Sequence, residues 1–134
     1  MISKDIRSLW RRTRLILTAY QELLAMEFLL KHGGFAAVHR TIAGLQLGVN
    51  VQGDDADVIC GAVDIACVFY FKEVLCLQRS AAAVRLLRKR GITAQFVTGV
   101  QQWPFSAHAW VEVAGRVVND KPHVIAAFGV IDRC

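Results

Sequence analysis

The chain has 134 residues, of which 54% are hydrophobic and two are proline. This composition predicts one globular domain over residues 1–134 and excludes a disordered or repetitive chain. A formal net charge of +5 leaves nucleic-acid binding open as a function.

The N-terminal segment is predicted to form an amphipathic helix over about residues 8–31, which Gly33-Gly34 end. Arginines before Leu15 give it a superficial likeness to a signal peptide, but Gln21 and Glu22 interrupt the apolar run after about six residues. Neither a signal peptide nor a transmembrane helix is therefore expected, and the expected location is the cytoplasm. The basic edge of the helix fits a solvated surface or an anionic membrane.

Two further helices are predicted in the mainly helical part, residues 1–71. Residues 35–47 suggest a short helix in which His39 is exposed or half-buried. Asp54-Asp55 offers an N-cap for a buried helix over residues 56–71.

Residues 72–134 are predicted to contain one helix and an antiparallel sheet. Good helix formers begin at Leu77 and Gly91 stops them, which leaves Cys76 at or near the helix start. Strands are predicted over residues 92–100, 105–113 and 124–131, with a loop over 101–104. Helices followed by an antiparallel sheet make an α+β fold, in which the Cys76 helix packs against the sheet.

The strand FSAHAWVEV (105–113) alternates between two faces. Phe105, Ala107, Ala109, Val111 and Val113 are predicted to face the core, and Ser106, His108, Trp110 and Glu112 to line one wall of a cleft. A three-residue loop ending at Gly115 would place Asp120 opposite His108. A two-residue Ala-Gly turn would break this register.

Cys76, His108 and Asp120 form a candidate nucleophile, base and orienting group. Unpaired N–H groups and the helix dipole favour a thiolate at a helix start and could hold an oxyanion. An imidazole nearby could carry the proton from the thiol to a leaving group. A His–Asp pair without a nucleophile would more simply be structural.

The stretches CLQRSAAAVRLLRKRGITAQFVTGV and FSAHAWVEVAGRVVND resemble transglutaminase-like cysteine enzymes, and more narrowly the lasso-peptide leader peptidase family. The resemblance is close over about residues 72–120. It implies a transglutaminase-like, papain-like core and a cytoplasmic Cys76–His108–Asp120 endopeptidase that removes the leader from a precursor peptide. The implied partners are a small leader-recognition protein and a separate ATP-dependent lasso cyclase.

Trp103 and Trp110 are candidates for binding the substrate, although each could instead be a loop anchor or core residue. Cys60 and Cys67 lack the C-x-x-C spacing of metal or redox sites and are expected to be buried, so neither a metal nor a cofactor is expected.

Two other functions stay open. The acyl-enzyme of the same triad could pass to an amine, as in a transglutaminase-like acyltransferase. The basic residues Arg79, Arg85, Arg88, Lys89 and Arg90 could mark a non-enzymatic interaction module. They are scattered around half of one helix without stacking aromatics, so a solvated face is predicted and no nucleic acid is expected.

Overall fold

The computed structural model describes residues 2–48 and 55–134. Its elements are α1 (Ile2–Ala43), α2 (Ala56–Phe69), α3 (Cys76–Lys89), β1 (Ala94–Gln102), β2 (Phe105–Val113), β3 (Arg116–Val117), α4 (Pro122–Ile125) and β4 (Gly129–Arg133). Helices precede an antiparallel sheet, so the predicted α+β class is confirmed. None of the described helices combines the length and the apolar composition that a membrane crossing requires.

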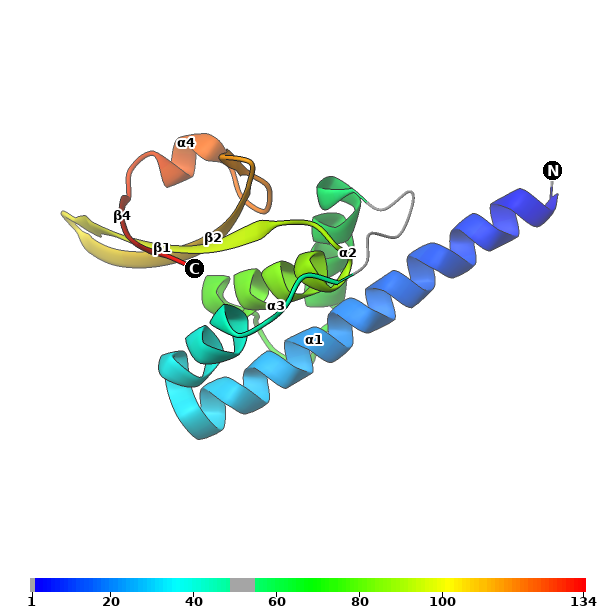
Figure 1. Ribbon diagram of the computed structural model, residues 1–134, viewed down its shortest axis with the longest axis horizontal. Coiled ribbons are helices and arrows are strands. Elements are labelled where there is room, and N and C mark those ends of the chain that lie inside the picture. The colour runs from blue at the N-terminus through cyan, green and yellow to red at the C-terminus, as the bar shows by residue number, and fades with distance from the viewer. Residues whose placement is uncertain (1, 49–54) are drawn as a thin grey trace.

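The elements stack in layers (Figure 1). Helix α3 lies between the sheet and α1, and α2 packs against both α1 and α3. The sheet has the strand order β3-β2-β1-β4, with every neighbouring pair antiparallel. The N-terminal end of α1 extends beyond the rest of the molecule (Figure 1).

Helix α1 is longer than predicted and bends where the sequence indicates. It buries Leu15, Ala19, Leu23 and Met26, which are spaced three or four residues apart along one side. Gly34 adopts φ 66° and ψ −162°, a left-handed backbone that separates the two helical parts. The first part begins at Ile2 rather than Ser8, because no Gly or Pro interrupts these residues.

Helix α2 confirms the predicted helix and half of its predicted cap, but the helix ends at Phe69 and only one side of it is buried, since Val68 and Phe69 are exposed. Asp55 is the N-cap, and its Oδ1 accepts a 2.8 Å hydrogen bond from Val58 N. Asp54, the other predicted cap, lies outside the described residues.

The predicted solvated basic face of α3 is wrong for most of its residues. The carboxylate of Glu22, which is buried, accepts hydrogen bonds from Arg85, at 2.9 Å, and from Lys89. The Arg88 guanidinium donates to the carbonyl oxygens of Ile42, Ala94 and Cys134 at 2.6–2.9 Å. These cations therefore hold α3 to α1 and to the sheet.

The two faces of the sheet are both covered. Phe96, Ala109 and Val111 belong to the main core shared with the helices. On the other face Trp110 is fully buried in a smaller core with Val97 and Ile125. The predicted cleft wall on this face is therefore wrong at Trp110, because α4 and the segment after it cover the indole.

The β2–β3 turn has two residues and not three. Ala114 and Gly115 both have positive φ, 51° and 77°, as a type I′ hairpin turn requires. Val113 consequently pairs with Arg116 and Glu112 with Val117, so the predicted three-residue loop and the strand register that follows from it are wrong.

The end of the chain also differs from the prediction. Pro122 begins the short helix α4, a position that its fixed φ favours, so the predicted strand over residues 124–131 is wrong in its first half. Strand β4 begins at Gly129 and pairs with β1. Strand β1 reaches Gln102, which leaves Trp103 and Pro104 as the connection to β2.

Candidate active site

Cys76 is the first residue of α3 and is half-buried. Leu75 precedes it at the N-cap position with an extended backbone, φ −85° and ψ 165°. A leucine side chain cannot accept a hydrogen bond, so it caps none of the N–H groups in the first turn. The cysteine therefore lies at the positive end of a helix whose first N–H groups have no capping side chain.

His108 and Asp120 meet although the predicted register is wrong. Beyond Val117 the chain leaves the β ladder, and Asn119 Oδ1 accepts a 2.8 Å hydrogen bond from Val111 N. This contact turns the next residue toward β2, where His108 Nε2 lies 2.6 Å from Asp120 Oδ2. The sequence-predicted pair is therefore in direct contact.

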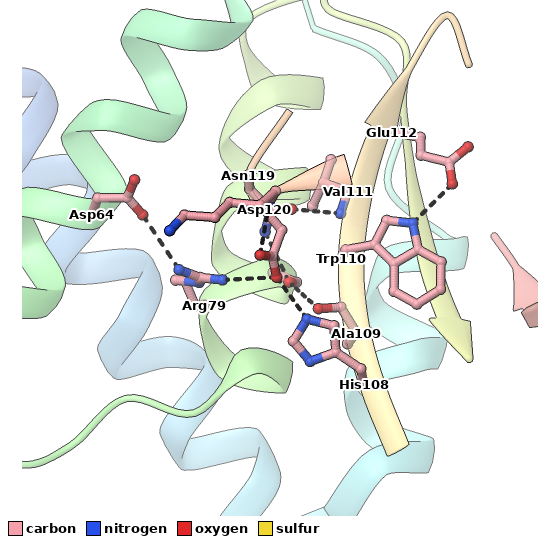
Figure 2. A network of polar contacts seen from close by, with 11 residues as sticks. Asp64, Arg79, His108, Ala109, Trp110, Val111, Glu112, Asn119 and Asp120 are labelled. Atoms are coloured by element: carbon pink, nitrogen blue, oxygen red, sulfur yellow. Dashed lines mark hydrogen bonds and ion pairs between the residues drawn. The ribbon is translucent and has the colours of Figure 1, made fainter. Parts of the chain in front are cut away.

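The His108 ring is held on more than one side. Its centroid lies 5.2 Å from that of Phe128 in a stacked arrangement, and 6.1 Å from that of Trp110. Only 18% of the histidine side chain and 15% of the Asp120 side chain are exposed, which limits water at their contact. Figure 2 shows the second ring nitrogen, Nδ1, on the side of the imidazole away from the carboxylate.

Arg79, which was predicted to lie on a solvated face of α3, is a member of this network. Its Nη2 lies 3.5 Å from Asp120 Oδ2, and its Nη1 lies 3.9 Å from Asp64 Oδ1 (Figure 2). Burial raises the pKa of Asp64. Arg79 follows Cys76 by three residues, which puts both on one side of α3, and this spacing is the signal that could have identified Arg79 from the sequence.

The pKa of Asp120 is lower than its ordinary value of 3.8. Burial alone would raise this pKa, but hydrogen bonds from His108 and from the Lys121 N–H, together with the charges of His108 and Arg79, outweigh it. Asp120 is therefore a carboxylate at neutral pH and can accept a hydrogen bond from a protonated ring nitrogen of His108.

A buried hydrogen-bond chain sets the position of α3 against β2. Ser80 Oγ donates to Ala109 O, and Asn119 Nδ2 donates to Ser80 Oγ, both at 2.9 Å. Ser80 follows Cys76 by four residues and Ala109 follows His108 directly, so the start of α3 faces this part of β2. No hydrogen bond joins Cys76 to His108 in the part of the chain described, so their direct contact stays a prediction.

Asn119→Ala is expected to destabilise the protein by about 2–4 kcal/mol, because Val111 N and Ser80 would lose a buried partner. Urea denaturation followed by circular dichroism measures this change. Asn119→Asp keeps an acceptor for Val111 N, but it removes the donor to Ser80 and buries a carboxylate beside Asp120, so it is expected to destabilise the protein as well. Unfolding free energies within about 0.5 kcal/mol of the unmodified protein for both variants would contradict the positioning role of Asn119.

The two tryptophans predicted to bind substrate are in opposite environments. Trp110 is fully buried and donates from Nε1 to Glu112 Oε2 at 2.8 Å, so its ring has no open face for a substrate. Trp103 is 91% exposed at the end of the β1–β2 hairpin and stays a proposal as a substrate contact. Phe105, predicted to be core, is 76% exposed because the hairpin end extends past the helices that cover its base.

The other cysteines are poorer candidates for the nucleophile. All four cysteines are free. Burial raises the pKa of Cys60 to about 12 and also raises those of Cys67 and Cys134. A raised pKa reduces the thiolate fraction at neutral pH.

A second His–Asp pair lies far from the start of α3. His39 Nε2 is 2.8 Å from Asp132 Oδ2, and Cys134 completes a group whose potential metal-ligand atoms lie within 4.8 Å of one another. Arg88 binds the Cys134 carbonyl twelve residues after Cys76, or about 18 Å along α3. This pair offers a matched comparison for His108 and Asp120.

Comparison with known proteins gives the family. Residues 22–133 match the model of the Transglutaminase-like superfamily. The chain belongs to this superfamily. Over 56 residues this transglutaminase-like chain is 46% identical to the microcin J25-processing protein McjB of Escherichia coli. The match covers 42% of the chain and 27% of McjB, so the chain matches well under half of that relative's length. No solved structure matches the chain.

Proposed function

We propose that the chain is a cysteine endopeptidase that removes the leader from a lasso-peptide precursor. Cys76 is the nucleophile, His108 the general base and acid, and Asp120 the group that orients the imidazole. The observation that carries the proposal is the 2.6 Å contact between His108 Nε2 and Asp120 Oδ2, on the strand against which the Cys76 helix packs.

The proton path follows from which nitrogen of the His108 ring is hydrogen-bonded to Asp120. Nε2–H donates a hydrogen bond to the Asp120 carboxylate, which leaves Nδ1 to accept the proton of Cys76. The thiolate attacks the scissile carbonyl, and Nδ1–H then protonates the departing amine. Water, activated by the same nitrogen, hydrolyses the thioester and releases the leader with a new carboxylate.

The start of α3 supplies a place for the oxyanion. Leu75 cannot cap the first-turn N–H groups, so they are available to a negatively charged oxygen beside Cys76. The tetrahedral intermediate places its oxyanion next to the attacked carbon, within reach of these donors.

Two comparisons of sequence support peptide processing. The stretch with the family resemblance contains all three proposed catalytic residues, and the chain is similar to a protein named for processing microcin J25. We extend the proposal to the partners that the resemblance implies: the precursor peptide, a leader-recognition protein and the cyclase that receives the product. The four free cysteines fit a cytoplasmic reaction.

Mass spectrometry of a precursor incubated with this protein, with and without the leader-recognition protein, tests the function. In water enriched in oxygen-18, the expected result is a single cut, with the heavy oxygen in the new carboxylate of the leader. Added hydroxylamine or amine identifies acyl transfer if it replaces water in that product. A precursor that stays intact with both proteins present would contradict the peptidase function.

A further inference from the structure

A groove of about 720 Å³ lies between the N-terminal half of α1 and α2. Its α1 side is one stripe of the helix, from Lys4 to Ile16 at spacings of three and four residues. Its α2 side is formed by residues from Asp57 to Ile65. The α1 side is about 18 Å long and the α2 side about 12 Å long, so the groove suits roughly four to six residues of an extended peptide.

The lining of the groove combines cations with an apolar floor. Lys4, Arg7, Arg11 and Arg12 line the end near the N-terminus, and Leu15 and Ile16 line the deeper end. Asp57 is the acidic residue of the lining, and its Oδ1 lies 3.3 Å from Arg116 Nη1, which offsets its charge. A complementary ligand therefore carries carboxylates and apolar side chains on the same segment.

Gly61 is an independent indication that something approaches α2 here. It lies within the helix, where glycine costs about 1 kcal/mol relative to alanine. A Cβ built on Gly61 would meet no atom within 4 Å, so internal packing does not require the glycine. Its missing side chain leaves the groove wall open to the backbone of a ligand.

We infer that this groove binds an acidic segment of the peptide substrate that does not include the cleaved bond. The assignment of the segment to the substrate rests on the proposed peptidase function. Ile65, at the inner end of the groove, follows Asp64, whose carboxylate lies 3.9 Å from Arg79 Nη1. A peptide in the groove consequently ends close to the network of Arg79 and Asp120.

Fluorescence anisotropy with a labelled hexapeptide of alternating glutamate and leucine tests the groove directly. All proteins carry Cys76→Ala, so a failure of catalysis cannot imitate a failure of binding. Arg7→Glu is compared with Arg14→Glu, which changes the same charge on an exposed part of the same helix outside the groove. Gly61→Trp, which fills the groove, is compared with Gly61→Ala, and circular dichroism checks each fold.

The expected result is a dissociation constant roughly tenfold higher for Arg7→Glu and for Gly61→Trp, with little change for Arg14→Glu or Gly61→Ala. The glutamine-leucine counterpart should bind weakly, and the unlabelled leader of the precursor should displace the probe. Equal weakening by Arg7→Glu and Arg14→Glu, or full binding by Gly61→Trp, would overturn the site. A leader that fails to displace the probe would overturn its assignment to the substrate. Arg7-dependent binding of phosphatidylglycerol vesicles without peptide binding would replace it with a membrane surface.

Discussion

Cys76→Ala is expected to reduce the rate of precursor cleavage by at least about a thousandfold, because the covalent step loses its nucleophile. We do not expect the other cysteines to substitute for it, since burial raises the pKa values of Cys60, Cys67 and Cys134 and so lowers their thiolate fractions. Cys76→Ser should be similarly inactive, because a hydroxyl at the same place holds its proton far more tightly.

Cys67→Ala is the matched control for this substitution. Cys67 is also free and half-buried, but it lies on α2 and outside the polar network around His108. Its replacement should leave the cleavage rate within about twofold, and neither alanine variant should move the melting temperature by more than a few degrees. Cleavage of the same bond at a similar rate by Cys76→Ala would remove Cys76 from the mechanism.

Asp120→Asn is expected to lower kcat by about two to four orders of magnitude while KM changes little. The carboxylate oxygen 2.6 Å from His108 Nε2 fixes the tautomer that leaves Nδ1 free to accept a proton. An amide can instead donate to Nε2, which favours the opposite tautomer and removes the negative charge that stabilises the imidazolium. Initial rates of precursor cleavage at several substrate concentrations separate kcat from KM.

Asp132→Asn gives the corresponding change in the second pair, where Asp132 Oδ2 lies 2.8 Å from His39 Nε2. Because that pair is near the other end of α3, its loss is expected to leave kcat within about twofold. Equal losses of kcat in both variants would indicate that the carboxylates act through stability alone.

The pH dependence of the unfolding free energy gives a second test of the Asp120 carboxylate. Its pKa is lowered in the folded protein, so its carboxylate stabilises the fold at neutral pH and this contribution is lost as the pH falls through the folded-state value, below 3.8. The difference in unfolding free energy between the unmodified protein and Asp120→Asn should therefore shrink in that acidic range.

Local signals predicted most of the elements. Gly34 and Gly91 each adopt positive φ where a helix ends, and Asp55 caps α2. These residues act through their own backbone or the adjacent turn, so their effect does not depend on distant contacts. The same is true of Cys76, which begins α3 because good helix formers follow it.

The contacts around the candidate active site depend on the β2–β3 turn and on the segment after β3, which the pattern of strand β2 alone does not determine. Ala114 tolerates a positive φ, which shortens the turn and shifts the register, yet Asn119 replaces a ladder contact and still brings Asp120 to His108. The correct pair was therefore predicted from an incorrect register. The burial of Trp110 depends on α4, whose four residues give too short a pattern to recognise as a helix.

Alkylation of the active protein by iodoacetamide tests directly whether Cys76 is the nucleophile. Residual cleavage of the precursor and the labelled fraction at each of the four cysteines are measured on the same samples by mass spectrometry. We expect Cys76 to be labelled first and activity to fall one-for-one with its labelling. Full activity after complete alkylation of Cys76, or a loss that follows Cys60, Cys67 or Cys134, would contradict it.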